Sequence, residues 1–243
     1  MRYAIYFTPP SSDALLKVAA NWLGRDAFSG EPVKRPAIRA LSAEEIACLT
    51  EEPRRYGFHA TLKAPFRLDD AFEESDLLSA LMHFASLTAP VVIPRLKLRA
   101  LGPFFALVPQ EPVAALNQLA NDVVVSLDRF RASLRDMEVA RRRPERLSEQ
   151  QRHNLERWGY PYVFEEFRFH MTLTGPVEEK NRPHVERILH DFFAPVLDET
   201  VEIANLALFM EPEPGAPFEI HSLHPMTGGT RMAKPPSRAV GRL

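Results

Sequence analysis

One short motif occurs twice in this chain of 243 residues and strongly constrains its fold. Residues 58–65 read Phe-His-Ala-Thr-Leu-Lys-Ala-Pro, and residues 169–176 read Phe-His-Met-Thr-Leu-Thr-Gly-Pro. Both copies follow the pattern Phe-His-x-Thr-Leu-x-x-Pro. One His-x-Thr would mean little in a chain with 8 histidines, but the shared flanking Phe, Leu and Pro residues indicate a true repeat.

Polar and apolar side chains alternate through each copy, which is typical of a half-buried β-strand. The sequence therefore predicts motif strands over about 57–63 and 166–174. The apolar faces belong to the core. The polar faces of the two strands carry Gly57, His59, Thr61 and Lys63, and Arg168, His170, Thr172 and Thr174.

The residue types on these polar faces suit phosphoryl chemistry. Imidazoles move protons near neutral pH, so we expect His59 and His170 to form an acid–base pair. A hydroxyl two residues further along a strand points to the same face, so Thr61 and Thr172 can donate to phosphate oxygens. Lys63 and Arg168 suit an anionic ligand, although either could equally be a solvated charge. The structural alternative is a duplication whose histidines only form hydrogen bonds in a core.

Composition limits the classes of protein that remain. A hydrophobic fraction of 45% is enough for a core, and the net charge of −2 disfavours a polynucleotide partner. A single cysteine, Cys48, rules out an internal disulfide and suggests a reducing, cytoplasmic compartment. No apolar run approaches the roughly 18 residues of a membrane span, and the apolar start is too short for a signal peptide. No metal site is expected, since His221 and His224 would point to opposite faces of a strand.

The order of predicted elements is the same after each motif: strand, helix, strand, strand. This predicts a duplicated α+β fold in which two antiparallel sheets face each other across a central cleft, with helices outside. We expect one bilobal domain over 1–225 and a flexible tail over 226–243. Further strands are expected over 2–8, 91–100, 103–109, 201–210 and 217–223. Helices are expected from a Ser11 or Ser12 cap to Leu23, from a Ser42 capping box, over 71–87, over about 24 residues from Pro112, over 148–157 and over 179–193.

With these motifs, the chain resembles the 2H phosphoesterase superfamily, which is named for paired His-x-Thr/Ser motifs. Within it, the chain is similar to a branch assigned to phosphonate metabolism and found beside C–P lyase genes. The similarity to that branch is carried by Tyr-Gly-Phe-His-Ala-Thr-Leu-Lys at 56–63, Arg-Arg-Arg-Pro-Glu-Arg-Leu at 141–147, Trp-Gly-Tyr-Pro-Tyr at 158–162 and Phe-Arg-Phe-His at 167–170.

The resemblance implies a phosphoesterase that opens or hydrolyses cyclic phosphodiesters without a metal or cofactor, or performs the reverse joining. His59 and His170 would be the acid–base pair, and Thr61 and Thr172 would hold non-bridging oxygens. The branch implies a small cyclic phosphate substrate such as ribose 1,2-cyclic phosphate 5-phosphate.

Other residues and other functions remain open at this point. Tyr56, Tyr160 and Tyr162 could line the cleft, and Arg141–Arg143 could reach a terminal phosphate or form a solvated loop. Residues 136–165 could form a lid. RNA end processing or ligation would need a basic, aromatic strip for a polynucleotide. A non-catalytic protein that binds phosphate esters could keep the same cleft.

Overall fold

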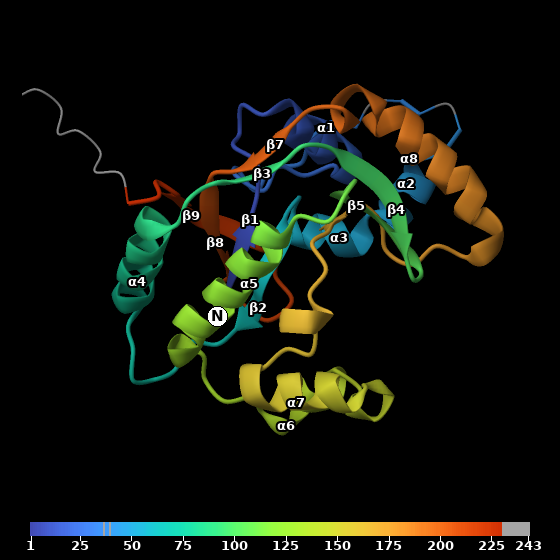
Figure 1. Ribbon diagram of the computed structural model, residues 1–243. Helices are drawn as coiled ribbons and strands as arrows, with labels where there is room; N and C mark the ends of the chain where they lie inside the picture. The colour runs from blue at the N-terminus through green and yellow to red at the C-terminus, as the bar shows by residue number, and fades with distance from the viewer. Residues whose placement is uncertain (36, 39, 230–243) are drawn as a thin grey trace, which may run out of the picture.

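The structure is a computed structural model that describes residues 1–35, 37–38 and 40–229 (Figure 1). Most of the tail predicted to be flexible, from residue 230 onward, therefore lies outside the described residues. None of the helices formed by the described residues combines the length and apolar character needed to cross a bilayer.

Seven strands form one antiparallel sheet in the order β4-β5-β6-β2-β1-β8-β9. Their bounds are Arg2–Phe7 (β1), Ala60–Phe66 (β2), Leu96–Leu101 (β4), Phe104–Pro109 (β5), Met171–Thr172 (β6), Asn205–Glu211 (β8) and Glu219–Pro225 (β9). A separate antiparallel pair joins β3 (Val91–Ile93) to β7 (Val201–Ile203). The predicted α+β class with antiparallel sheets is confirmed.

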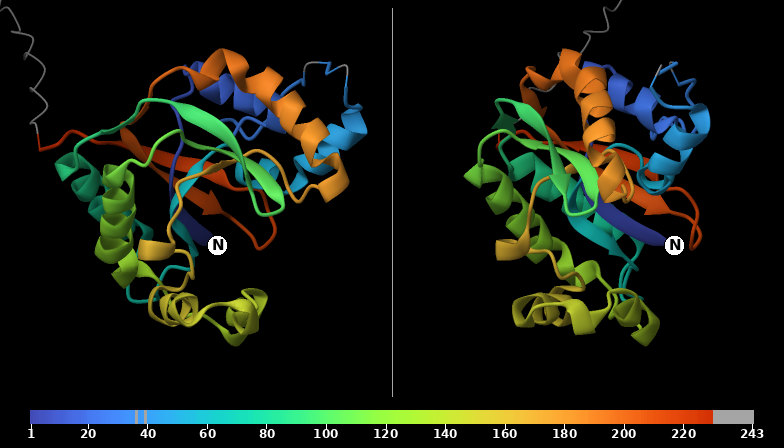
Figure 2. Two further views of the ribbon diagram at one scale, coloured as in Figure 1. Left: turned by 45° about the vertical axis from the view of Figure 1, so that its right-hand side comes forward. Right: turned by 90° about the vertical axis from the view of Figure 1, so that its right-hand side faces the viewer.

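Eight α-helices accompany the strands in the described parts of the chain. They are α1 (Ala14–Leu23), α2 (Ala43–Leu49), α3 (Glu51–Tyr56), α4 (Glu74–Leu87), α5 (Ala114–Leu127), α6 (Asp136–Arg141), α7 (Glu149–Trp158) and α8 (Arg182–Leu197). Figure 2 shows α6 and α7 at the end of the molecule far from α1 and α8.

The repeat of element order predicted from the sequence is present. After β2 come α4, β3, β4 and β5, and after β6 come α8, β7, β8 and β9. The strands expected over 91–100 and 201–210 are each divided in two, at Pro94–Arg95 and at Ala204. Pro94 lacks an N–H for the ladder, which explains the first division.

The two motif strands are direct neighbours in the sheet. Ala60 of β2 pairs with Met171 of β6, and Thr172 pairs with Ala106 of β5 on the other side. The prediction placed the two polar faces on facing sheets; in the structure one continuous sheet carries both. Direct pairing satisfies backbone groups that would otherwise form an exposed edge along each motif strand.

Alternate side chains of β1 separate the two sides of the sheet. Tyr3, Ile5 and Phe7 join the main hydrophobic core, to which α1, α4, α5 and α8 also contribute. Tyr6 belongs to a small second cluster on the opposite side, which includes Phe209 and Phe218. The large helices therefore cover one side of the sheet and leave the other side for a site.

Several boundaries differ from those predicted. α1 is capped by Asp13, whose side chain accepts from the Leu15 N–H at 2.7 Å, rather than by Ser11 or Ser12. α5 has 14 residues instead of about 24. β6 has only 2 residues, because the chain on either side of it is irregular. The predicted Ser42 capping box is present, and Ser148 forms another at the start of α7.

Candidate functional site

A hollow of about 300 Å³ lies on the side of the sheet that the large helices leave free. Both motifs contribute to it, through His59 and Thr61 of the first and Thr172 of the second. A second hollow of about 340 Å³ contains His170 and shares Thr61 with the first. The two hollows therefore form one cleft over the junction of β2 and β6.

His59 is held in one orientation by its neighbours. Its Nδ1 lies 2.9 Å from the carbonyl oxygen of Gly57, and a carbonyl can only accept, so Nδ1 must carry a proton. The ring stacks on Tyr6 with centroids 4.0 Å apart and planes 24° apart. This leaves Nε2 as the reactive nitrogen, with the Thr61 hydroxyl 3.3 Å away.

His170 repeats the same arrangement. Its Nδ1 lies 2.7 Å from the carbonyl oxygen of Arg168, again two residues earlier in the chain. The Phe104 ring contacts it with centroids 5.9 Å apart. Both imidazoles are thus fixed in the Nδ1-protonated form when neutral, and both keep Nε2 for chemistry.

The cleft also shifts the proton affinity of both rings. Burial lowers the pKa of His59 to about 4; the hydrogen bond to the Gly57 carbonyl opposes this, and charge on His170 adds to it. Burial likewise lowers the pKa of His170, against the hydrogen bond to the Arg168 carbonyl. Both rings are therefore mainly neutral near pH 7 in the free protein, and each lies within electrostatic reach of the other.

Hydrogen bonds between distant segments hold the motif backbones in place. The Thr8 hydroxyl donates to the Phe58 carbonyl at 2.9 Å, just before His59. In the second motif, the Trp22 indole donates to the Leu173 carbonyl at 2.8 Å. The hydroxyl of Thr174 accepts from the Phe105 N–H at 3.0 Å. The segments around both histidines are therefore fixed by contacts outside their own short strands.

Lys63 does not lie in the cleft, contrary to the prediction. Its ammonium is buried and forms an ion pair with Asp128, with Nζ 2.9 Å from Oδ1. The reason is an irregularity in the β1–β2 ladder: Thr61 pairs with Tyr6 and Lys63 with Ile5, so β2 has an extra residue there. Such a bulge breaks the alternation and takes Lys63 off the face of Thr61.

Arg168 and Tyr56 lie at the cleft, in different ways. Arg168 is exposed at the rim of the His170 hollow, and its guanidinium donates to the carbonyls of Glu165 and Phe167, both at 2.8 Å. Tyr56, at the end of α3, lines the His59 hollow and stacks on Phe218 with centroids 5.0 Å apart.

Several lining residues were not predicted as site residues. Arg2, Tyr6, Phe104 and Thr174 line the same hollow as His59. The sequence does mark Thr174, because it follows Thr172 on the polar face of the second motif. Arg2 and Tyr6 lie in the first strand, far from either motif in sequence, and only the pairing of β1 with β2 brings them to the site.

Arg142 and Tyr160, which the sequence left open, also line this hollow. Asn154 of α7 helps to fix the turn that carries Tyr160, because its buried amide donates to the Pro161 carbonyl at 3.2 Å. Tyr162 and Tyr160 line the His170 hollow, and their rings meet edge to face with centroids 5.5 Å apart.

A metal-binding cluster is not evident in the part of the chain that the structure describes: no group of three or more His, Cys, Asp or Glu side chains there could hold an ion. His221 instead lies 3.2 Å from Glu74 through Nε2, and His224 lies 2.8 Å from the Ser222 hydroxyl.

Two curated relatives carry the name ribose 1,5-bisphosphate phosphokinase PhnN. The protein from Janthinobacterium sp. (strain Marseille) is 38% identical over 244 residues, which cover 98% of this chain and 54% of the relative. The protein from Laribacter hongkongensis (strain HLHK9) is 35% identical over 229 residues, covering 90% and 50%. The chain thus spans about half the length of the curated relatives it matches.

Two solved structures align over most of this chain at low sequence identity. TT0787 of Thermus thermophilus aligns at 16% identity and a TM-score of 0.45, over 94% of this chain and 99% of that one. LigT of E. coli, crystallised with 3′-AMP, aligns at 11% identity and a TM-score of 0.43, over 93% and 98%. These TM-scores lie below 0.5 and carry no functional conclusion.

One family model covers the first motif from Thr61 onward and all of the second motif. It matches residues 61–219, well over half of the chain, and its description is "Protein of unknown function (DUF1045)". The protein therefore belongs to the DUF1045 family.

Proposed function

We propose that this protein is a 2H-type phosphoesterase that hydrolyses a small cyclic phosphodiester. The observation that carries the proposal is the paired arrangement of the imidazoles. His59 and His170 each bind a backbone carbonyl two residues earlier through Nδ1, and each presents Nε2 to one cleft. A hydroxyl from each motif, Thr61 and Thr172, lines the same cleft.

In the proposed reaction, water attacks phosphorus and a P–O bond of the cyclic diester breaks. One imidazole takes the proton of the water on its Nε2, while the other gives its Nε2 proton to the leaving ring oxygen. A phosphomonoester is formed, and exchange with solvent restores the two protonation states. Thr61 and Thr172 donate to non-bridging oxygens and stabilise the charge that develops there.

We propose different roles for the two rings on the basis of their environments. Charge on either ring disfavours charge on the other, so the pair binds its first proton on one ring; His170 is the more exposed of the two and loses less solvation when it is charged. A bound phosphodiester anion raises the pKa of both rings, which charges His170 in the complex. We therefore assign His170 as the general acid and His59, the ring with its pKa lowered to about 4, as the general base.

The relatives' names guide the choice of substrate. They are named for a kinase of ribose 1,5-bisphosphate, and this chain spans only about half of each. The sequence has no Walker-type glycine loop, so we do not assign a kinase reaction to it. Hydrolysis of ribose 1,2-cyclic phosphate 5-phosphate would yield a ribose bisphosphate, which connects the proposed activity to the relatives' printed substrate.

The proposal is tested by measuring turnover of cyclic phosphates in the presence of EDTA. The panel contains ribose 1,2-cyclic phosphate 5-phosphate and nucleoside 2′,3′-cyclic phosphates, with the His59→Ala/His170→Ala double variant as control. We expect hydrolysis by the wild type alone, with a bell-shaped pH profile that belongs to the pair of imidazoles. Equal turnover by the double variant would refute the proposal. Loss of turnover in EDTA that zinc or manganese restores would indicate a metallohydrolase instead.

A further inference from the structure

A group of phenols and guanidiniums lies in the cleft beyond the imidazoles. Tyr6, Tyr56, Tyr160, Arg2 and Arg142 all line the hollow that contains His59. Burial raises the pKa of the Tyr6 phenol well above its usual range, and the guanidiniums of Arg2 and Arg142 oppose part of that rise. The two arginines therefore lie within electrostatic reach of the Tyr6 hydroxyl and line the same hollow, although they are 140 positions apart in a chain of 243 residues.

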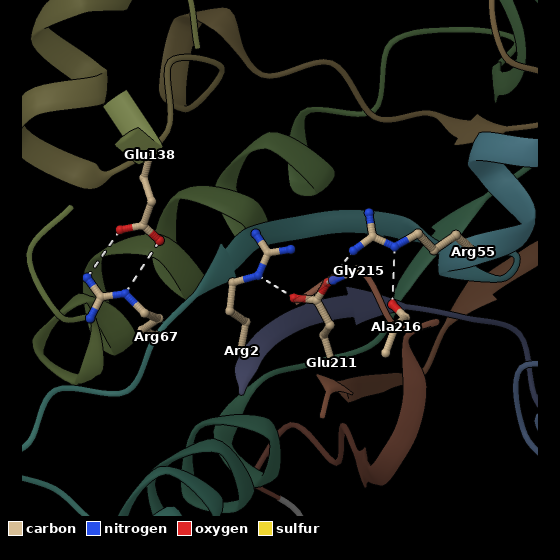
Figure 3. A network of polar contacts seen from close by, with 7 residues as sticks. All are labelled: Arg2, Arg55, Arg67, Glu138, Glu211, Gly215 and Ala216. Carbon is tan, nitrogen blue, oxygen red and sulfur yellow. Dashed lines mark hydrogen bonds and ion pairs between the residues drawn. The ribbon is translucent and has the colours of Figure 1, made fainter. Parts of the chain in front are cut away.

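Arg2 is fixed by a carboxylate behind it. Glu211 is fully buried, and it binds Arg2 through Nε and Arg55 through a terminal nitrogen. The Gly215 N–H adds a hydrogen bond to Glu211 at 3.0 Å. Figure 3 shows the two terminal nitrogens of Arg2 pointing away from Glu211. Arg2 is thus anchored by one nitrogen and presents two others as donors.

Arg142 comes from a different part of the chain and has a different support. It follows α6 directly, and its guanidinium carbon lies 4.9 Å from the centre of the Tyr160 ring. α6 is attached to the end of β2 by an ion pair between Arg67 and Glu138, with 3.2 Å between the charged atoms (Figure 3). Across the described residues, Arg142 forms no ion pair, so its charge is available to a ligand.

The charges at this end of the cleft do not cancel. Arg2 and Arg55 share the single carboxylate of Glu211, which leaves one positive charge, and Arg142 adds another. Glu52 is the one acidic side chain among the described residues that line the hollow. It lies beside the second motif, since a side chain built at Gly175 would come within 3.8 Å of its carboxylate.

We propose that Arg2 and Arg142, with the hydroxyls of Tyr6, Tyr56 and Tyr160, form a subsite for a second phosphate, a phosphomonoester at the opposite end of the substrate from the cyclic diester. Guanidiniums with several free N–H groups match the oxygens of a phosphate dianion, and neutral phenols donate further hydrogen bonds. This subsite rests on the proposed function, and it selects substrates that carry both groups.

The position of the subsite relative to the imidazoles fits such a substrate. The ring of Tyr6 stacks on His59, and the guanidiniums of Arg2 and Arg142 lie within electrostatic reach of its hydroxyl. The proposed subsite therefore adjoins His59 within the same hollow. A hollow of about 300 Å³ suits a ligand of the size of a furanose with a phosphate at each end.

The test compares two substrates and three proteins. The substrates are ribose 1,2-cyclic phosphate with and without the 5-phosphate. The proteins are the wild type, Arg142→Met and the control Arg141→Met, which removes the same charge from the neighbouring exposed position. Arg142 is chosen over Arg2 because loss of Arg2 would also remove a partner from buried Glu211.

We expect the wild type to prefer the 5-phosphorylated substrate in kcat/KM. Arg142→Met should reduce that preference by about 10- to 100-fold, the range for loss of a charged hydrogen-bonding partner. The substrate without the 5-phosphate should change less than about 3-fold, and Arg141→Met should behave as the wild type. No preference in the wild type, or an equal loss for both substrates in Arg142→Met, would overturn the proposal.

A binding measurement separates failure of the subsite from failure of the proposed activity. Ribose 5-phosphate has no cyclic diester, so calorimetric titration with it reports the subsite even if no cyclic phosphate is turned over. Binding to the wild type and to Arg141→Met, but not to Arg142→Met, would support the subsite alone. Absence of binding to the wild type would refute it. The same comparison with nucleoside 2′,3′-cyclic phosphates, with and without a 5′-phosphate, distinguishes a sugar phosphate from a nucleotide as its source.

Discussion

Acidification should destabilise this protein through His59 in particular. The pKa of this imidazole falls from 6.5 to about 4 on folding because the ring is buried against Tyr6. Below pH 6.5 the unfolded chain therefore binds a proton that the folded chain does not. The free energy of unfolding must decrease as the pH falls from 6.5 toward 4, and the contribution is complete above 6.5.

The size of the effect follows from the two pKa values. The linkage relation gives a loss of about 1.8 kcal/mol between pH 7 and pH 5 for this one group. Because the ring is partly open to the cleft and to water, we expect about 1–2 kcal/mol. Other groups shift in the same direction, including Asp128 and Glu211, whose carboxyl pKa values are held below their usual range by arginine and lysine partners despite burial.

A matched variant isolates the contribution of His59. In His59→Asn the side-chain amide can replace Nδ1 in the hydrogen bond to the Gly57 carbonyl, but it does not titrate. Urea unfolding at pH 7 and pH 5, followed by tryptophan fluorescence to which the buried Trp22 contributes, gives the free energy for each protein. The wild type should lose about 1–2 kcal/mol more than His59→Asn over this interval. Equal losses in the two proteins would refute the assignment of a buried, neutral imidazole.

Two further predictions concern residues beside the motifs. Gly57→Ala should cost about 2–4 kcal/mol, because φ is +74° and an added Cβ would come within 2.5 Å of the Ala27 Cβ. Gly175→Ala, with no atom closer than 3.7 Å, should cost less than about 1 kcal/mol in the same urea titration; similar losses would contradict the backbone argument. Lys63→Met should lower stability by about 1–3 kcal/mol, since it leaves Asp128 with fewer partners, while KM stays unchanged. A tenfold rise in KM in a stably folded Lys63→Met protein would instead show that Lys63 contributes to binding the phosphate.

The sequence predicted the elements with strong local signals. The Ser42 capping box predicted the start of α2, and the alternation around both motifs predicted the strands β2 and β6. Phe58 and Met171 are buried as the alternation requires. The length of α5 was overestimated because its end depends on tertiary contacts. Asp128 begins a 3-10 turn and forms an ion pair with Lys63, which lies 65 positions earlier in the chain, as well as a local one with Arg131.

In the candidate site, too, some residues were predicted from local sequence signals and others depend on the tertiary structure. His59, Thr61 and Thr172 line the cleft, and their matching positions in the repeat are the signal that marks them in the sequence. Lys63 shares the same alternation, but a bulge in the β1–β2 ladder removes it, and Pro65 is the local sign that this strand is irregular. Arg2 reaches the cleft only because β1 is inserted between β2 and β8, which is a property of the whole sheet.

The interleaved order of strands has a consequence for how the protein is made. β1 pairs with β8 from Arg2–Glu211 to Tyr6–Ala207, so its partner is synthesised roughly two hundred residues later. Contacts between such distant segments slow folding, and an apolar strand such as β1 is prone to aggregation until its partner strand is available. β6 likewise enters between β5 and β2, strands that are made much earlier. The two imidazoles can therefore meet only late in folding, and a nascent chain that stops short of β8 should lack the finished cleft.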